Sequence, residues 1–349
     1  MKRLDAIRDF LKNYDGPECK IMEVCGTHTA AIVKNGIPSM LSPKITLISG
    51  PGCPVCVTVT SYIDRLVELS DDRRNVILAF GDLLRVRGSV KSLSEAKAEG
   101  AGVRMVYSPM ETVDLAEQDP EHNYIFAAVG FETTTPAYEL MLEEASRRGL
   151  SNVQVLTSLK TMPEVIRWLC ENDRGKEHPV TGFIAPGHVC AVSGYELYRP
   201  IAEQYHIPFI VSGFTGEQLL CTIYGLVRER GKGTVRNFYP QVVKSSGNPA
   251  ARKAVESMFR PCDAAWRGMG VIPGSGMELK PEFARFDAGS QGLWEDHTGN
   301  GCRCADVLMG RIRSQECPMF GTACTPQNPM GACMVSQEGS CFNCYQAGM

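Results

Sequence analysis

The chain has 349 residues, 44% of them hydrophobic, and a formal net charge of −3 at pH 7. A chain of this length can form two or three domains, each with its own hydrophobic core. The charged residues are dispersed along the sequence, and acidic residues slightly outnumber basic ones. The sequence therefore indicates no positively charged surface for nucleic acid or anionic lipid headgroups. We therefore expect neither nucleic acid nor a membrane among its partners.

The N-terminal residues do not resemble an export signal. Residues 1–16 mix charged and apolar side chains at helical spacing and lack the unbroken apolar stretch of a secretory signal. No other run approaches the roughly 20 apolar residues of a membrane span. We therefore expect a cytoplasmic protein. Its fifteen cysteines then indicate metal or redox chemistry, because structural disulfides rarely persist in a reducing compartment.

From residue 20 to about residue 230 one pattern recurs: a short apolar run, a turn marked by Gly or Pro, and a helical pattern. One such helix is expected to open with Pro136 and to end at Gly149. Parallel α/β architecture is the prediction. Eight units can close as one barrel or split into two open doubly wound sheets, and periodicity alone does not decide. The expected strands are 20–24, 45–49, 75–80, 103–107, 124–129, 153–158, 182–185 and 207–211.

In either arrangement, the loops that follow the strands gather at one edge of the sheet, where α/β proteins bind their ligands. Polar residues and thiols are frequent in these loops. The last of them is a poor match to a phosphate-binding loop, so we infer no nucleotide site from it. In chain order they are CGTHT (25–29), GPGCPVC (50–56), GDLLR (81–85), SPMET (108–112), GFETTTP (130–136), LKTMPE (159–164), APGHV (185–189) and SGFTGEQ (212–218).

Cys53 and Cys56 form a CxxC pair in the second of these loops. They can be a redox dithiol, part of a metal site, or two small buried residues. The residues after them are expected to be helical, which would place Cys56 near a helix N-terminus and favour its thiolate. Because Gly and Pro on both sides indicate a specialised turn rather than a packing surface, we favour a functional pair.

Three further loops carry candidate site residues. Cys25 ends the first expected strand, and its thiol is expected to be exposed at the loop edge. With the CxxC pair it would make a soft pocket suited to iron, copper(I) or zinc. His28 can act there as a ligand or proton carrier, or can bond only to local backbone. Glu132 and His188 occupy corresponding positions in later units, as acids, bases or ligand-orienting groups, or as ordinary loop residues.

The C-terminal segment is rich in cysteine, and its Gly, Pro and Asn residues favour turns over long elements. Such a segment needs a cross-link to be ordered, which four thiolates around an iron–sulfur cluster or zinc would supply. Because no histidine lies among these cysteines and zinc modules usually show closer CxxC pairs, we predict a [4Fe–4S] cluster. The thiols exceed four, so a dithiol can lie beside the cluster. They are Cys302, Cys304, Cys317, Cys324, Cys333, Cys341 and Cys344.

Five segments, taken in order, resemble the HypD family of hydrogenase maturation factors and cover nearly the whole chain. They are EVCGTHT, SGPGCPVC, VGFETT, APGHV and CPMFGTACTPQNPMGACMVSQEGSC. The resemblance implies two Rossmann-like, doubly wound parallel-sheet α/β domains plus a smaller Cys-rich iron–sulfur domain. We place these at residues 1–120, 121–235 and 236–349. A further possibility is that the N-terminal helix packs on the third domain.

The resemblance also implies a function. In this family the protein, with its small partner HypC, is the scaffold on which the Fe(CN)2CO moiety of [NiFe]-hydrogenases is assembled, and HypE is the cyanide donor. Cys25 would hold the iron of this moiety together with HypC, and Cys53 and Cys56 would be the redox pair beside it. His28, Glu132 and His188 would handle protons or orient ligands around the same cleft.

Four of six C-terminal cysteines would ligate the [4Fe–4S] cluster, and the choice among them stays open: Cys302, Cys304, Cys317, Cys324, Cys333 and Cys341. Cys344 is an extra thiol relative to the family pattern. The alternative function is a cluster-dependent thiol–disulfide reductase resembling ferredoxin–thioredoxin reductase. A third hypothesis is a zinc-structured module on a ligand-binding α/β protein.

Overall fold

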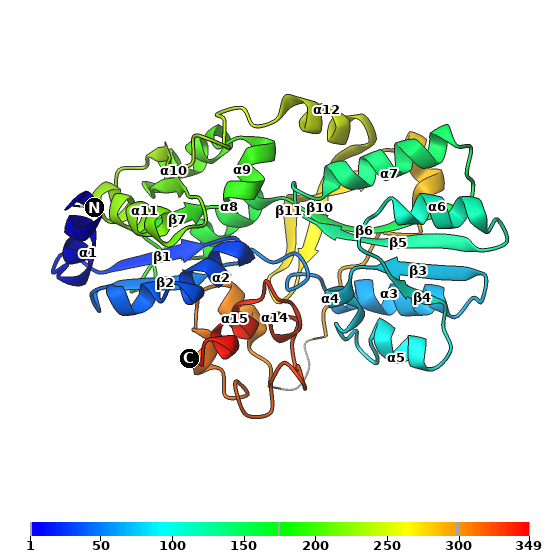
Figure 1. Ribbon diagram of the computed structural model, residues 1–349, viewed down its shortest axis with the longest axis horizontal. Coiled ribbons are helices and arrows are strands. Elements are labelled where there is room, and N and C mark those ends of the chain that lie inside the picture. The colour runs from blue at the N-terminus through cyan, green and yellow to red at the C-terminus, as the bar shows by residue number, and fades with distance from the viewer. Residues whose placement is uncertain (1, 174, 298–300, 349) are drawn as a thin grey trace.

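The computed structural model describes residues 2–173, 175–297 and 301–348 and contains two separate β-sheets (Figure 1). The first sheet has five strands in the order β2-β1-β7-β8-β9, all parallel to their neighbours. Its strands are β1 (Cys19–Glu23), β2 (Ile45–Ser49), β7 (Gly182–Ala185), β8 (Phe209–Val211) and β9 (Val235–Asn237).

The second sheet has six strands in the order β10-β11-β6-β5-β3-β4. Strands β4, β3, β5 and β6 are parallel, whereas the β10–β11 hairpin joins the edge of β6 in antiparallel orientation. Of the two predicted topologies, the structure therefore has two open sheets rather than a barrel. The strands are β3 (Asn75–Ala79), β4 (Val103–Met105), β5 (Asn123–Gly130), β6 (Val153–Lys160), β10 (Phe259–Trp266) and β11 (Gly270–Leu279).

Neither sheet is one continuous stretch of chain. After β1 and β2 the chain builds the parallel part of the second sheet, and it then returns to place β7 beside β1 with Ile21 opposite Gly182. The boundary expected at residue 120 is crossed, since β3 pairs with β5. The boundary expected at residue 235 is crossed as well, since Met277 of β11 pairs with Leu159 of β6.

Helices cover both sheets and connect their strands (Figure 1). The first twelve are α1 (Lys2–Lys12), α2 (Gly26–Lys34), α3 (Thr60–Ser70), α4 (Gly81–Leu84), α5 (Leu93–Ala98), α6 (Glu111–Gln118), α7 (Thr135–Arg147), α8 (Met162–Asp173), α9 (Gly187–Ser193), α10 (Arg199–Tyr205), α11 (Gly216–Glu229) and α12 (Pro249–Met258). Short 3-10 turns occur at η1 (Ile37–Met40), η2 (Glu196–Tyr198) and η3 (Pro281–Phe286).

The N-terminal helix α1 packs on α11 of the first sheet and not on the C-terminal segment. The ring of Phe10 meets the ring of Tyr224 edge-on, with centroids 5.0 Å apart. Leu11 is fully buried in the same cluster as Leu219 and Ile223 of α11. The apolar face of α1 therefore closes the helical layer of the first sheet.

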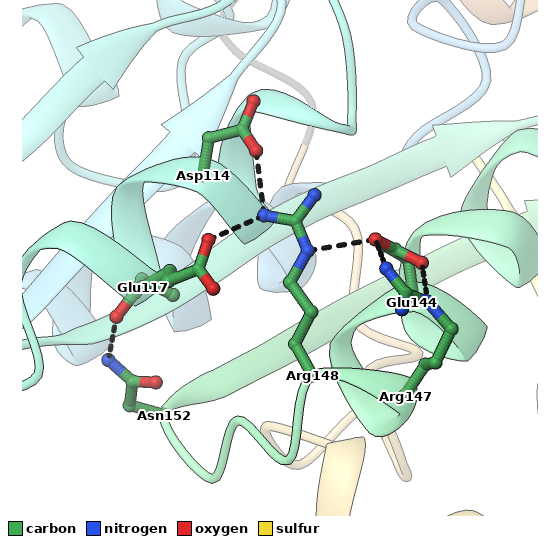
Figure 2. Close-up of polar contacts among 7 residues, drawn as sticks. Asp114, Glu117, Glu144, Arg147, Arg148 and Asn152 are labelled. Carbon is green, nitrogen blue, oxygen red and sulfur yellow. Dashed lines mark hydrogen bonds and ion pairs between the residues drawn. The ribbon is translucent and has the colours of Figure 1, made fainter.

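A charged network fixes the end of α7 against α6 (Figure 2). The Nη1 atom of Arg148 donates to Asp114 at 3.0 Å and to Glu117 at 2.7 Å, while its Nε atom donates to Glu144 at 2.8 Å. Asn152, the residue before β6, donates a side-chain hydrogen bond to the carbonyl of Ala116 in α6. One guanidinium thus connects two helices on the same face of the second sheet.

The C-terminal residues 301–348 form short helical turns, and their described residues contain no named strand. They are α13 (Cys304–Leu308), η4 (Ser314–Glu316), α14 (Ala332–Val335) and α15 (Ser340–Gln346). Figure 1 shows α14 and α15 below the junction of the two sheets. Arg85 donates to the carbonyl of Val335 at 2.9 Å, and Asp82 accepts a hydrogen bond from Ser336 at 3.0 Å. The GDLLR loop after β3 therefore holds this segment in place.

None of the helices in the described ranges combines the length and apolar character needed to cross a lipid bilayer.

Candidate functional site

Both sheets reverse their winding direction next to their first strand. In the first sheet β1 lies between β2 and β7, and in the second sheet β3 lies between β4 and β5. The loops after such strands diverge and leave a crevice, which is the usual ligand position in open α/β sheets. Here the loops after β1, β7, β3 and β5 line the same cavity, of about 330 Å³.

Five of the eight loops singled out in the sequence meet at this cavity, and one residue of the C-terminal segment joins them. The remaining lining comes from Val24, directly after β1, and from Ala127 and Val129 of β5. The loop and C-terminal residues are Cys25, Thr27, Gly52, Pro54, Val55, Phe80, Leu83, Phe131, Thr133, Thr134, Pro186, His188, Val189 and Glu338.

Cys25 lines the cavity but is buried rather than exposed, in contrast to the sequence-based expectation. Only 8% of the residue is accessible to solvent. Burial raises the pKa of its thiol to about 12, and the carboxylates of Glu23 and Glu338 act in the same direction. The free thiol therefore keeps its proton at neutral pH, and a soft metal has to displace that proton to bind the sulfur.

Cys53 and Cys56 form a disulfide with their Cα atoms 5.2 Å apart. Both residues are buried, so the disulfide lies behind the cavity wall formed by Gly52, Pro54 and Val55. The prediction that Cys56 lies at a helix N-terminus is wrong, since α3 begins only at Thr60. The helix dipole therefore has no direct effect on Cys56.

The disulfide loop packs directly on the Cys25 loop at Gly52. The carbonyl of Gly52 accepts a hydrogen bond from the backbone of Gly26 at 3.1 Å. A Cβ atom on Gly52 would overlap the backbone nitrogen of Cys25. Glycine is thus required for the two cysteine loops to lie against each other.

His28 and His188 are joined through an aromatic residue that the sequence analysis did not identify, Phe214. The Phe214 ring centroid lies 4.5 Å from that of His28 and 4.2 Å from that of His188, with interplanar angles of 28° and 25°. Two nearly parallel rings cannot share one face of Phe214 at these distances, so Phe214 lies between them. It comes from the SGFTGEQ loop after β8, one of the eight loops expected at the ligand edge, although no residue of this loop was predicted to be in the site.

The two histidines have different environments. His28 is fully buried, and among the described residues neither of its ring nitrogens makes a hydrogen bond. Burial lowers the pKa of His28 to about 4, so its ring is neutral. His188 lines the cavity and is exposed to solvent. Only His188 is therefore placed to contact a ligand in the cavity.

Glu132 lies behind the cavity wall rather than in it. Its Oε1 atom accepts a hydrogen bond from the backbone of Met162 at 2.9 Å, while its buried Oε2 atom has no partner among the described residues. Burial raises the pKa of Glu132 to about 7. Its carboxylate adds to the effect of burial in raising the pKa of Cys190, so Glu132 and this thiol are neighbours.

Two carboxylates near Cys25 were missed by the sequence analysis. Glu23 accepts a hydrogen bond from the backbone of Cys25 at 2.9 Å and bonds to the hydroxyl of Thr29. Burial raises the pKa of Glu23 to about 7. The backbone of Glu338 passes close to Gly26. A Cβ atom added to Gly26 would lie 2.5 Å from the carbonyl oxygen of Glu338. The only sequence signal was their presence in the quoted motif segments.

The thiols of the C-terminal segment gather in one region. The Sγ atoms of Cys304 and Cys333 are 2.7 Å apart. A hydrogen bond from Cys333 lowers the pKa of Cys341. Burial raises the pKa of Cys302 to about 12, and neighbouring Cys304, Cys324 and Cys341 contribute. Cys317 lies close enough to Cys324 to influence its pKa.

Cys344 lies beside this group, next to Cys341, whose charge acts on the pKa of the Cys344 thiol. Burial raises the pKa of its thiol, which also bonds to Ser314 and Ser340. It lines a different cavity, next to Glu23. Cys344 therefore lies between the cysteine group and the Glu23 side of the molecule.

The C-terminal thiols are a chemically suitable donor set for an iron–sulfur cluster, because several soft ligands approach one another without histidine. In the described ranges no group of three or more Cys, His, Asp or Glu side chains is already arranged to hold a metal ion. The sulfur atoms of Cys304 and Cys333 would have to separate to admit a cluster. The disulfide is adjacent, since Cys56 Sγ lies 3.9 Å from the carbonyl oxygen of Ala332.

Comparison with known proteins gives a consistent family. Residues 2–348 match the HypD family model, described as the hydrogenase formation hypA family. The hydrogenase maturation factor HypD of Escherichia coli is 40% identical, over 94% of this chain and 88% of the relative. HypD of Azotobacter vinelandii is 38% identical, over 94% of this chain and 89% of the relative.

An archaeal relative extends the similarity further. The putative hydrogenase expression/formation protein of Methanocaldococcus jannaschii is 37% identical, over 99% of this chain and 96% of its own length. The matches therefore include both sheets, the cavity between their loops and the cysteine-rich C-terminal segment. The chain belongs to the HypD family of hydrogenase maturation factors.

Proposed function

We propose that this protein is the scaffold and redox component on which the Fe(CN)2CO moiety of [NiFe]-hydrogenase is assembled. In this proposal Cys25 holds the iron through its thiolate, together with HypC, and HypE delivers cyanide. The iron with its cyanide and carbonyl ligands is the cargo of the reaction. Family membership supports a maturation role, and we expect this role to be carried out in the cytoplasm.

The observation that carries the proposal is the position of Cys25 in a cavity built by the loops of both sheets. A thiolate is a suitable ligand for low-spin iron, and the cavity walls from residues 129–134 and 186–189 are mostly apolar. His188 faces the same space, where it can donate a hydrogen bond to a cyanide nitrogen. Thr27 and Thr133 add hydroxyl-bearing side chains to the lining.

The disulfide has a separate role in the proposal. Its reduction takes up two electrons and two protons and yields the thiols of Cys53 and Cys56. A [4Fe–4S] cluster held by four of the C-terminal cysteines would supply the electrons one at a time when bound. The contact between Cys56 and the backbone of Ala332, next to Cys333, supports this path because it brings the disulfide beside the thiol group.

The four ligands are chosen from the thiols that lie together. We propose that they come from Cys302, Cys304, Cys317, Cys324, Cys333 and Cys341, and that the two remaining thiols form a dithiol beside the cluster. Cys344 is left out of this set because it lines another cavity, next to Glu23.

Hydrogenase maturation in cells lacking the endogenous protein tests the proposal. We expect Cys25→Ser and Cys53→Ser to abolish hydrogenase activity while both variants accumulate as folded, iron-containing protein. Cys221→Ser, which alters a half-buried thiol on α11 outside the cavity, is the matched control and should retain full activity. Full activity in Cys25→Ser would overturn the scaffold role.

Metal analysis separates the cluster from zinc. After anaerobic purification we expect iron and acid-labile sulfide in equal amounts of about four per chain, as a [4Fe–4S] cluster requires. Stoichiometric zinc without sulfide would instead support a zinc-structured module.

A thiol–disulfide reductase is the second candidate, and the buried disulfide beside the cysteine group favours it. It would pass electrons from the cluster to a protein disulfide without holding iron at Cys25. Turnover of a disulfide substrate by the purified protein, without partners and unaffected by Cys25→Ala, would favour this candidate over the scaffold.

A further inference from the structure

A second polar cavity, of about 230 Å³, lies at the carboxyl end of β6, where the β10–β11 hairpin joins the parallel sheet. It shares no lining residue with the Cys25 cavity. Ligand cavities typically have about 300–1,000 Å³, so this one has room only for a small molecule. Its polar lining residues are Thr157, Ser158, Lys160, Cys262, Asp263, Glu278, Ser290 and Gln291.

Lys160, from the LKTMPE loop that the proposed function leaves without a role, is the unusual residue here. It is the last residue of β6 and only 3% of it is exposed. Its Nζ atom donates to Ser158 Oγ at 2.7 Å and lies 5.8 Å from the ring centroid of Trp266. In the described part of the chain, no carboxylate lies within 4.0 Å of this amine. Buried lysines are normally paired with an anion.

The two acids that line the cavity are already engaged elsewhere. Glu278 bonds to Arg260 at 2.7 Å and to Gln291 at 2.6 Å. Asp263 accepts a hydrogen bond from the backbone of Gly274 at 2.9 Å. Lys160 therefore has no anionic partner among the described residues, and the negative charge of these carboxylates disfavours a ligand with more than one charge.

The donors facing the cavity suit one carboxylate group. Lys160 has two N–H groups left after its bond to Ser158. The Ser158 oxygen accepts that bond, so its own hydrogen is available to donate, and the Cys262 thiol adds a weaker donor. A carboxylate offers about four lone-pair positions, which match these four hydrogens.

We propose that this cavity binds one small monoanion of the carboxylate type, such as formate, acetate or hydrogencarbonate, against the Lys160 amine. The proposal does not depend on the role of Cys25. Burial lowers the pKa of Lys160 to about 7 in the unliganded protein. A bound anion favours the charged amine, so binding above neutral pH takes up a proton.

Titration calorimetry of the full-length holoprotein with sodium formate, acetate and hydrogencarbonate tests the proposal. We expect one saturable site whose affinity falls about tenfold for each pH unit above neutrality, as the amine loses its proton. Measurements in two amine buffers with different ionisation heats should show proton uptake. Tryptophan fluorescence should change with the same saturation, because Trp294 lines the cavity and Trp266 lies beside the Lys160 amine. Sulfate, a dianion, should bind at least about tenfold more weakly.

Lys160→Met removes the amine and retains most of the length of the side chain. It should weaken binding by at least about tenfold, while Ser158→Ala should weaken it by about three- to tenfold. Lys253→Met, at an exposed position of α12, is the matched control and should bind as the wild type does. Equal binding by Lys160→Met and wild type would overturn the proposal. If that variant does not fold, absence of saturable binding or of proton uptake by the wild type would overturn it.

Discussion

Burial dominates the chemistry of individual residues around the Cys25 cavity. It raises the pKa of Cys25 to about 12 and the pKa of Glu132 to about 7, and it lowers the pKa of His28 to about 4. All three groups are thus biased toward their uncharged forms. A charge in this region therefore has to come from a bound ligand or from a proton transfer during the reaction.

Glu132→Gln tests this view through folding stability. The pKa of Glu132 in the folded protein, about 7, exceeds the ordinary value of 4.5. The contribution of Glu132 to folding stability is therefore complete below pH 4.5 and is lost as the pH rises through 7. Glutamine does not titrate, so the variant does not lose stability in this way. Urea unfolding should show it more stable than wild type at about pH 8 by up to about 3 kcal/mol, and not at about pH 4.5.

Burial also raises the pKa of Glu23 to about 7. Glu23 therefore makes the free energy of unfolding fall with pH to a similar extent in the wild type and in Glu132→Gln. The comparison therefore concerns the difference between the two stability curves. Parallel curves from about pH 4.5 to about pH 8 would contradict a buried, uncompensated carboxylate at position 132.

Phe214 is expected to orient His188 toward the cavity. Phe214→Leu removes the ring that stacks on both imidazoles, so His188 should gain rotational freedom and maturation should fall by about tenfold, equivalent to about 1.4 kcal/mol. Phe214→Tyr keeps the ring and should restore activity. NMR of the His188 ring provides the structural readout. If Phe214→Leu matures hydrogenase normally, the stack has no part in function.

Sequence patterns located Cys25 and His188 because both follow an apolar strand, and strand ends define the ligand edge of a parallel sheet. They could not locate Phe214 or Glu338. Phe214 matters through contacts with two residues from other loops, and Glu338 through its passage over Gly26. Contacts of this kind leave no periodic trace in a single sequence.

At the level of secondary-structure elements, the two cysteine loops depend on Gly52 for their contact. Gly52→Ala should push the disulfide loop away from Cys25, lower stability by about 2 kcal/mol through overpacking, and abolish maturation. Gly231→Ala is the matched control. Its φ of +77° makes alanine unfavourable by about 1 kcal/mol, yet the site is open.

The control should therefore lose stability and keep its activity, as measured by urea unfolding and hydrogenase maturation in the same strain. Retained activity in Gly52→Ala, despite a comparable loss of stability, would show that the contact between the two cysteine loops is not needed.

All eight strands predicted from apolar runs are present, as β1 to β8. Strands β9, β10 and β11 were missed because their sequences are not apolar runs: β9 is VRN, β10 contains Arg260, Pro261 and Asp263, and β11 contains three glycines and a proline. The start of α3 was placed too early. Val57 and Thr58 are β-branched, and their carbonyls accept hydrogen bonds from Arg267 instead of from a following helical turn.

At the scale of the whole molecule, each sheet combines segments that are distant in the sequence, so the chain does not divide into consecutive domains. Apolar periodicity identifies strands but not their partners, so residue 120 looked like a boundary although β3 and β5 pair across it. The hairpin β10–β11 looked like the start of a third domain for the same reason. The two open sheets were implied by the family resemblance and not by the periodicity.

The C-terminal segment connects to the second sheet through Asp82. Its Oδ2 atom accepts hydrogen bonds from Ser336 at 3.0 Å and from the backbone of Gln337 at 3.1 Å. Asp82→Ala should lower stability by about 1–3 kcal/mol and increase hydrogen exchange in residues 330–346. Asp71→Ala, at an exposed position after α3, is the control. Unchanged exchange in Asp82→Ala would show that other contacts hold the segment.

Infrared spectroscopy of the protein co-expressed with its maturation partners tests the central claim most directly. If Cys25 holds the iron, the wild type should show nitrile and carbonyl stretching bands that disappear in Cys25→Ala. Cys190→Ala, which removes a buried thiol outside the cavity lining, should keep them. Bands of full intensity in Cys25→Ala would contradict the account, because the iron would then be held elsewhere.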